Sequence, residues 1–261
     1  MSQRVAVVTG SNKGIGFGIV DKLCSVFDGT IYLTARNEEL GLRAMKQLQA
    51  TNPTARHKLR FHQLDITNVE SIKRFADHIQ RTHGGLDVLV NNAAIAFKNA
   101  DPTPFGEQAE ITIRTNFFGT MNVCNALFPL LRPHARVVNV SSRAGMLESI
   151  RNLEIRRLLA SSDTTVQLIA DIVNDFIIKA KQNLHQQTGY PKTAYGMSKI
   201  ALTAATFIQQ RLFNNQPDND IVVNSMCPAA DTPVYLATLP PYVKSPRGEF
   251  VAERNILKWK C

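Results

Sequence analysis

Tyr195 and Lys199 are the two residues whose types and spacing most directly suggest chemistry. They lie four positions apart in TAYGMSK, residues 193–199, a segment that is predicted to be helical. Four positions make about one helical turn, so both side chains point to the same side. A tyrosine titrates at about pH 10, and an ammonium group one turn away lowers that pKa. The pair can therefore act as a general acid or base, although this spacing also occurs by chance on many helices.

A glycine-rich turn follows the first predicted strand. The apolar run at 4–8 predicts a buried strand, and TGSNKGIG at 9–16 leads from it into an amphipathic helix. In this arrangement backbone N–H groups and a helix N-terminus can receive a pyrophosphate; the alternative is a tight connection without a ligand. The candidate cofactor-binding residues of the turn are Gly10, Ser11, Asn12, Lys13, Gly14, Ile15 and Gly16.

Arg36 follows the second predicted strand, residues 30–35. In dinucleotide folds an acidic residue at this point binds the ribose 2′-hydroxyl of NAD, whereas an arginine suits the 2′-phosphate of NADP. Lys13 adds a second cation nearby. The two residues predict NADPH as the cofactor; otherwise they are solvated surface charges.

Strands and helices alternate regularly through the first half of the chain. The further predicted elements are helices over about 38–51, 68–83 and 106–131, and strands at 58–65, 86–94 and 136–142. This order predicts an α/β fold: a Rossmann-like doubly wound parallel sheet flanked by helices, with ligands at the carboxyl ends of the strands. Asp65 and Asn92 lie at such ends. They would bind the adenine edge and hold the turn against the cofactor, or only cap the next turn or helix.

Asn116, Ser141 and Ser142 are further polar candidates. Asn116 lies among apolar residues of a predicted helix, where an unpaired amide would cost roughly 1–3 kcal/mol, so we expect it to join a proton relay. The two serines end the strand that includes Val140, on the same edge of the sheet as the glycine turn. One of them would bind a substrate carbonyl oxygen.

Five motifs in order resemble the short-chain dehydrogenase/reductase superfamily. They are TGSNKGIG (9–16), NNAA (91–94), the helix around Asn116, VVNVSS (137–142) and YGMSK (195–199). Longer stretches, such as FHQLDI, GGLDVLVNNA, TNFFGT and TPVYLA, are similar to the cytosolic NADPH-dependent carbonyl reductases over essentially the whole chain. The resemblance implies hydride transfer from a nicotinamide to a ketone, aldehyde or quinone.

The same resemblance implies a role for each catalytic candidate. Tyr195 would donate a proton to the carbonyl oxygen with Ser142 as its hydrogen-bonding partner, and Ser141 is the alternative. Lys199 would bind the nicotinamide ribose and lower the tyrosine pKa, while Asn116 would hold a water that links Lys199 to solvent. The other cofactor-binding residues are expected to be Asp65, Ile66, Asn92, Ala93, Val140 and Pro228.

An apolar substrate cleft is expected beside Ser142 and Tyr195. Its walls would be Ile95, Ala96, Phe97, Met146 and Tyr235, although Phe97 can equally be a core residue. The resemblance implies small carbonyl substrates: quinones, aromatic aldehydes and ketones, some prostanoids and glutathione conjugates. The sequence does not rank them.

A long insertion, about 143–190, separates Ser142 from Tyr195. It shows helical patterns near 148–160 and 163–184, the second with Asp163 as its N-cap. The resemblance implies that the insertion covers the surface through which relatives oligomerise, and hence a monomer. The alternative is that its apolar stripe is a partner interface. That stripe comprises Val166, Ile169, Val173, Phe176, Ile177, Ala180 and Leu184.

Two features depart from the family pattern. Ala94 replaces the glycine of the usual NNAG, which is tolerable if this position has a negative φ. Relatives carry a loop of roughly twenty residues that would close over the nicotinamide, whereas this chain passes almost directly from Pro228 to Thr232. Either the sequence omits mobile residues, which an intact mass above 29.0 kDa would indicate, or the chain is a shortened form. A shortened form could be a catalytically weak NADP-binding or interaction protein.

Composition limits the remaining classes of function. The chain has 261 residues and a net charge of +9, but its basic residues are dispersed and accompany no nucleic-acid module, so we expect no nucleic-acid binding. No apolar run approaches the roughly 18 residues that span a membrane, and the start resembles no signal peptide. Four scattered cysteines fit reduced thiols rather than disulfides or a metal site. We expect one cytoplasmic domain, residues 1–261, that binds neither a membrane nor a metal.

Overall fold

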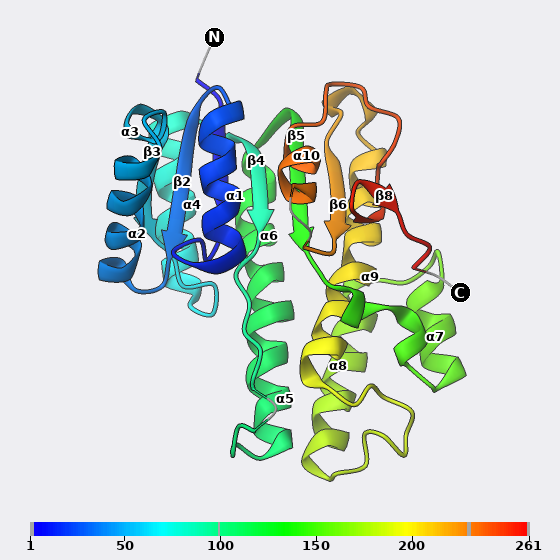
Figure 1. Cartoon of the computed structure of the whole chain (residues 1–261). Helices are drawn as coiled ribbons and strands as arrows, with labels where there is room; N and C mark the ends of the chain where they lie inside the picture. The colour runs from blue at the N-terminus through cyan, green and yellow to red at the C-terminus, as the bar shows by residue number, and fades with distance from the viewer. Residues whose placement is uncertain (1–2, 99, 229–230, 260–261) are drawn as a thin grey trace.

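A single eight-stranded sheet forms the centre of the molecule, and Figure 1 shows it with helices on both sides. The computed structural model describes residues 3–98, 100–228 and 231–259, so Cys261 and part of the join after Pro228 lie outside the described residues. The strands are β1 Val5–Val8, β2 Thr30–Ala35, β3 Leu59–Gln63, β4 Leu86–Asn91, β5 Leu131–Val140, β6 Val222–Met226, β7 Phe250–Ala252 and β8 Asn255–Ile256. The helices are α1 Gly14–Val26, α2 Glu38–Thr51, α3 Ala55–Lys58, α4 Val69–His83, α5 Phe105–Ile113, α6 Thr120–Leu127, α7 Leu153–Ala160, α8 Val166–Lys181, α9 Ala194–Asn214 and α10 Thr232–Ala237.

The strand order is β3-β2-β1-β4-β5-β6-β7-β8. Every neighbouring pair from β3 to β7 is parallel, and only β8 runs antiparallel to β7. The order of the first six strands is that of doubly wound dinucleotide-binding folds, whose strand order reverses between the paired strands β1 and β4. The α/β prediction is confirmed. The run GEFVAE contains β7, which is flanked by β6 and β8 and is therefore not an edge strand.

Alternate residues of the buried strands serve opposite faces of the sheet. In β1, Ala6 and Val8 pack with α1, α2 and α10, whereas Val5 and Val7 pack with α4 and α6. A third apolar cluster lies between α5, α8 and α9. Since the central strands β1, β2 and β4 are buried on both faces, their residues are mostly apolar, and polar side chains gather at their ends.

The insertion folds back onto the body of the protein. Helix α8 begins after Thr165, whose side chain accepts a 3.1 Å hydrogen bond from the Leu168 N–H, so the expected N-cap Asp163 is wrong. The apolar residues of α8 pack against α5 and α9, as Figure 1 also shows. Ile169, Val173 and Phe176 are fully buried in this contact. The stripe is therefore intramolecular packing at these positions.

The long helix expected at 106–131 is interrupted. Its middle, Arg114–Gly119, is a π-helical turn between α5 and α6, and it contains Asn116. Such wide turns often mark functional positions, because the extra residue redirects a side chain. The helix also ends early, since β5 already starts at Leu131.

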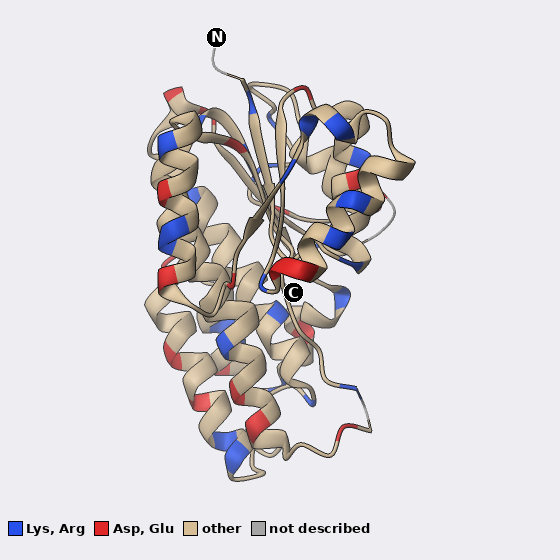
Figure 2. Ribbon diagram, turned by 90° about the vertical axis from the view of Figure 1, so that its left-hand side faces the viewer, with Lys and Arg blue, Asp and Glu red and all other residues tan. Residues whose placement is uncertain are grey.

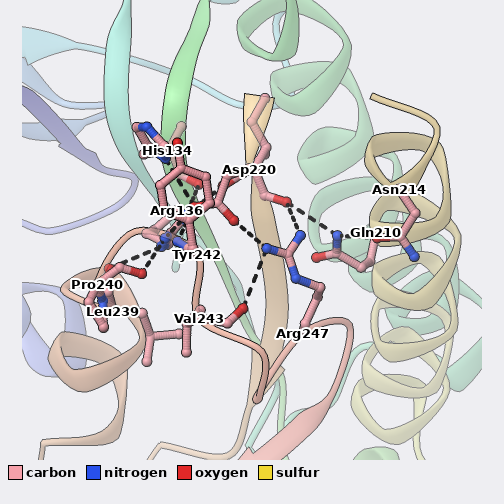
Figure 3. Close-up of polar contacts among 12 residues, drawn as sticks. His134, Arg136, Gln210, Asn214, Asp220, Leu239, Pro240, Tyr242, Val243 and Arg247 are labelled. Carbon is pink, nitrogen blue, oxygen red and sulfur yellow. Dashed lines mark hydrogen bonds and ion pairs between the residues drawn. The ribbon is translucent and has the colours of Figure 1, made fainter. Parts of the chain in front are cut away.

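Near the amino-terminal end of β6, the buried carboxylate of Asp220 holds several segments together (Figure 3). Asp220, 2% exposed, bonds Arg136 at 3.1 Å and His134 at 3.0 Å, accepts 2.7 Å from the Tyr242 N–H, and pairs with Arg247. Arg136 also donates to the carbonyls of Leu239 and Pro240. Burial alone would raise the pKa of Asp220, but these hydrogen bonds and charges hold it well below its usual range. The chain after α10 is thereby fixed to the start of β6.

Charges are distributed over the surface rather than gathered. Figure 2 shows Lys and Arg interspersed with Asp and Glu along the helices. Within the described ranges, no helix has the length and apolar character needed to cross a bilayer.

Candidate active site

The glycine turn after β1 is packed directly against the segment that follows β4. Gly10 has φ +59°, and a Cβ there would lie 2.8 Å from the Cα of Ala93. At Gly16 a Cβ would lie 2.4 Å from Asn92 Nδ2. The Asn92 amide donates to the carbonyls of Thr9 and Gly10 at 2.9 and 3.0 Å. Asn92 therefore holds the turn, and only glycine fits at both positions.

Thr9 is a site residue that sequence reasoning missed. It is buried, and its Oγ1 accepts hydrogen bonds of 3.0 Å from the N–H groups of both Asn92 and Ala93. The available signal was a threonine directly before the first glycine of the turn. Ala94 keeps a negative φ, since the described non-glycine residues with positive φ do not include it.

The residues around this turn fit the phosphates of NADPH. Helix α1 starts at Gly14, and its N-cap Lys13 makes no side-chain capping bond, so the first N–H groups point to an open end. Lys13 and Arg36 are exposed, and neither belongs to an ion pair within the described part of the chain. The backbone of the turn bonds the end of β2, since Ser11 N–H donates 2.8 Å to Thr34 O. Lys13 follows β1 and Arg36 follows β2, and these two strands end side by side.

Asp65 lies two residues after β3 and caps its own turn. Its Oδ1 accepts hydrogen bonds from the Thr67 N–H and hydroxyl at 2.9 and 2.7 Å. Ile66 is buried. Oδ1 of Asp65 therefore caps the turn, as the alternative interpretation expected. A contact of Asp65 with adenine stays a prediction.

The two serines after β5 have different surroundings. Ser141 is fully buried, with its hydroxyl 2.6 Å from Thr203 Oγ1 and 3.1 Å from Lys199 O. Ser142 is half-buried; its hydroxyl accepts from the Ala144 N–H at 3.1 Å and lies close enough to Tyr195 to act on the pKa of the phenol. Only Ser142 therefore lies at the tyrosine hydroxyl.

Tyr195 and Lys199 lie on the first turns of α9, as the spacing predicts. Thr193 starts this helix by accepting from the Gly196 N–H at 3.1 Å. The Lys199 ammonium lies 5.4 Å from the centre of the Tyr195 ring and donates a 2.6 Å hydrogen bond to Val140 O. Val140 thus reaches the site through its carbonyl group.

The electrostatics of this pair differ from the expectation. Burial raises the pKa of Tyr195, a rise that the Ser142 hydrogen bond opposes and the nearby Cys227 thiol adds to. Burial also lowers the pKa of Lys199 to about 8. The predicted lowering of the tyrosine pKa by Lys199 is therefore wrong: desolvation of the phenol raises this pKa, and Lys199 is not among the groups that act on it.

Asn116 is paired through its side chain. Its Oδ1 accepts 2.8 Å from the Ile95 N–H, and its Nδ2 donates to Ile95 O and Ser198 Oγ at 2.9 and 3.1 Å. Both Nδ2 hydrogens are thus used within the protein, while Oδ1 keeps a second lone pair, and the expected water stays a prediction. Asn116 fixes the backbone of Ile95 beside α9.

The predicted substrate residues are not brought into one cluster. Met146 packs with the α9 side of the molecule, whereas Tyr235 packs with the α1 side and lies under the Arg254 guanidinium, 5.3 Å from its ring centre. Phe97 is half-buried and Ala96 is exposed. Pro228, at the end of β6, is the last described residue before the join.

A cavity of about 520 Å³ lies between segments that are close in sequence to Ser142 and Tyr195, although neither of these two residues is among those that line it. It is lined from both ends of the insertion, and two of its residues, Ala144 and Thr193, lie two positions from the catalytic candidates. Arg151 and Lys192 face it without an ion pair among the described residues, together with Glu148. Sequence reasoning missed this cavity, because its two walls are far apart in the chain.

Comparison with known proteins identifies the family. The sequence profile described as short chain dehydrogenase matches residues 4–153, more than half of the chain. The chain belongs to the short-chain dehydrogenase family. Carbonyl reductase 1 (NADPH) of Homo sapiens is 44% identical over 279 positions that cover 98% of each protein.

Solved structures of other short-chain dehydrogenases share the fold. Menthone neomenthol reductase from Mentha piperita superposes with a TM-score of 0.85 at 29% identity, covering 97% of this chain and 99% of the other. Salutaridine reductase from Papaver somniferum gives 0.84 at 31% identity, covering 95% and 99%. The alignment with the human enzyme is longer than the 261 residues of this short-chain dehydrogenase, in agreement with a shortened segment.

Proposed function

We propose that this short-chain dehydrogenase is an NADPH-dependent carbonyl reductase. It reduces quinones, aromatic aldehydes, ketones and some prostanoids to hydroquinones or alcohols. The observation that carries the proposal is that the Ser142 hydroxyl lies close enough to Tyr195 to act on the pKa of its phenol, at the edge of the sheet that carries the glycine turn. The name of the human relative, which is 44% identical, supports the same activity.

The chain's own residues position the substrate and supply a proton. Bound NADPH supplies the hydride. The hydroxyls of Tyr195 and Ser142 hold the carbonyl oxygen and stabilise the negative charge that develops on it. Tyr195 is protonated at neutral pH and can serve as the acid, and the Ser142 hydroxyl, which opposes the rise in its pKa, favours release of the proton to the carbonyl oxygen. Lys199 faces Tyr195 from the next turn and would bind the ribose.

Cofactor recognition rests on the turn and the two exposed cations. The first N–H groups of α1 bind the pyrophosphate, and Arg36 and Lys13 bind the 2′-phosphate. The remaining contacts with the adenine and the nicotinamide of the cofactor come from Asp65, Ile66, Ala93 and Pro228. Asn92 acts indirectly, through the Thr9 and Gly10 carbonyls that it binds.

The cavity beside the site supports acidic substrates, including glutathione conjugates. Arg151 and Lys192 outnumber the one carboxylate, Glu148, and a guanidinium group binds carboxylates well. A carbonyl compound held at Tyr195 would place its acidic group in this cavity.

The rest of the assignment follows from packing. Because α8 covers α5, the surface that relatives use to oligomerise is occupied, which supports a monomer. We propose that residues 1–261 form one reductase domain and that it works in the cytoplasm. Light scattering on the purified protein tests the monomer, since a dimer mass would contradict it.

A single experiment separates the reductase from the alternative, a catalytically weak NADP-binding protein favoured by the shortened segment. NADPH oxidation with menadione is measured beside NADH and beside Tyr195→Phe. Turnover that prefers NADPH and falls in the variant supports the reductase. Folded protein that binds NADPH without turnover would support the alternative.

A further inference from the structure

Trp259, which follows β8, is buried against the catalytic region. Only 2% of it is exposed, and its indole N–H donates a 2.6 Å hydrogen bond to the carbonyl oxygen of Gly145. Its ring lies 5.2 Å from that of Phe207 on α9. A buried indole usually finds such a partner, but this one is 114 positions away in the chain.

Gly145 ends the short turn that Ser142 begins. The Ser142 hydroxyl accepts from the Ala144 N–H at 3.1 Å, and the Ser142 carbonyl accepts from the Gly145 N–H at 2.9 Å. Gly145, whose carbonyl accepts the indole hydrogen bond, is therefore linked to Ser142 through its own N–H group.

The turn also packs closely against α9. A Cβ on Gly145 would lie 2.7 Å from the backbone carbon of Lys199, closer than real side chains come. The backbone of Gly145 thus lies against both Lys199 and Trp259, and the indole, which also packs on Phe207, connects the turn to α9.

Trp259 is itself held by the sheet. The Leu257 N–H donates 2.8 Å to Phe250 O, which extends the antiparallel pairing of β8 with β7. Arg143, the first residue of the turn, also bonds Glu253 of the same hairpin at 3.4 Å, although both groups are exposed. The β7–β8 hairpin therefore reaches the catalytic turn at two points.

We propose that Trp259 is a positioning residue that sets the place of Ser142 relative to Tyr195 through the Gly145 carbonyl. This inference rests on the proposed carbonyl reduction. Without the indole donor the buried Gly145 carbonyl lacks a partner, which favours a shift of the turn toward water. A displaced Ser142 hydroxyl then supports both the tyrosine and the developing oxyanion less well.

The matched variants are Trp259→Phe, which keeps an aromatic ring but removes the donor, and Phe207→Leu, which disturbs the same packing and keeps the donor. With menadione we expect Trp259→Phe to lower kcat about 10- to 100-fold while the Kd for NADPH stays within about twofold. Because the Ser142 bond opposes the rise in the tyrosine pKa, the alkaline limb of the kcat profile should move to higher pH. Phe207→Leu should show neither change.

Hydrogen exchange provides a readout that needs no turnover. In Trp259→Phe the peptide covering 142–146 should exchange faster than in the wild type, while α9 peptides keep their protection. Wild-type protein that fails to reduce menadione would count against the proposed function alone, since the exchange result still decides on Trp259. Unchanged exchange at 142–146, or equal losses of kcat in both variants, would overturn the positioning role.

Discussion

The ammonium group of Lys199 donates a 2.6 Å hydrogen bond to the carbonyl oxygen of Val140. Burial lowers the pKa of Lys199 from 10.5 to about 8. Between these pH values the unfolded chain binds more protons than the folded one, so the free energy of unfolding should rise from about pH 8 to 10.5.

Lys199→Met removes this titration as well as the activity. At neutral pH the variant loses the cost of a buried charge, about 3 kcal/mol, but leaves the Val140 carbonyl unpaired, which costs about 1–3 kcal/mol. The two effects nearly cancel, so the useful observable is the change of the free energy of unfolding with pH. Urea unfolding at several pH values should show a rise for the wild type that the variant lacks; parallel curves would contradict the lowered pKa.

Ser141 and Ser142 should respond differently to substitution. Ser142→Ala removes a hydroxyl from the reacting oxygen and should lower kcat by about 100- to 1000-fold with little change in stability. Ser141→Ala should keep most activity and cost about 1 kcal/mol, because its partners Thr203 and Lys199 O are buried. Steady-state kinetics and urea unfolding of both variants decide; greater loss of activity for Ser141→Ala would reverse the assignment.

Arg36 and Lys13 should determine the choice of cofactor. Arg36→Ala with Lys13→Ala should weaken NADPH binding by about 10- to 100-fold and leave NADH binding nearly unchanged, since only NADPH carries the 2′-phosphate. Lys46→Ala on α2 with Lys73→Ala on α4, an equal change of charge, is the control. Fluorescence titration gives the dissociation constants of both cofactors for each protein, and equal weakening for both cofactors would speak against these residues.

Arg151 and Lys192 should affect acidic substrates alone. Arg151→Gln with Lys192→Gln is expected to raise KM for a glutathione conjugate of a quinone by about tenfold, with unchanged kinetics for menadione. Lys46→Gln on α2 with Lys73→Gln on α4, which also removes two positive charges, controls for net charge. If both substrates respond equally, the cavity is not a subsite for the acidic group.

Asp220 should contribute more to stability than any surface ion pair. Asp220→Asn leaves the buried Arg136 charge without its partner and should cost about 3–5 kcal/mol. The pair of Glu39 with Arg43, whose side chains are 78% and 70% exposed, is the control, and Glu39→Gln should cost less than about 1 kcal/mol. Because the pKa of Asp220 is lowered on folding, its contribution is present above pH 3.8, the ordinary carboxyl value, and is lost only as the pH falls toward the folded-state pKa. Urea unfolding measures each difference.

The sequence predicted the features that depend on local spacing. The glycine turn, the helical placement of Tyr195 and Lys199, and the strand ends that carry Asn92 and Ser142 all follow from periodicity within one element. The parallel direction of the strands follows from the βα alternation, because parallel strands need helical crossovers.

Features that join distant segments could not be predicted in this way. The indole of Trp259 on the Gly145 carbonyl, and the Asp220 cluster, arise from three-dimensional packing that no short motif encodes. The tyrosine pKa was predicted with the wrong direction because burial, a tertiary quantity, raises it. The π-helical turn at Asn116 has the same origin, since its amide is drawn to the backbone of Ile95.

The bonds of Arg136 to the Leu239 and Pro240 carbonyls anchor the chain beyond α10 at the amino edge of the sheet. Helix α10 is thus secured from behind, independently of the connection that enters it from β6. Insertions and deletions in that connection can accumulate during evolution without unfolding the protein. Relatives can therefore differ in the length and sequence of the connection between β6 and α10 while the anchored chain beyond α10 stays the same.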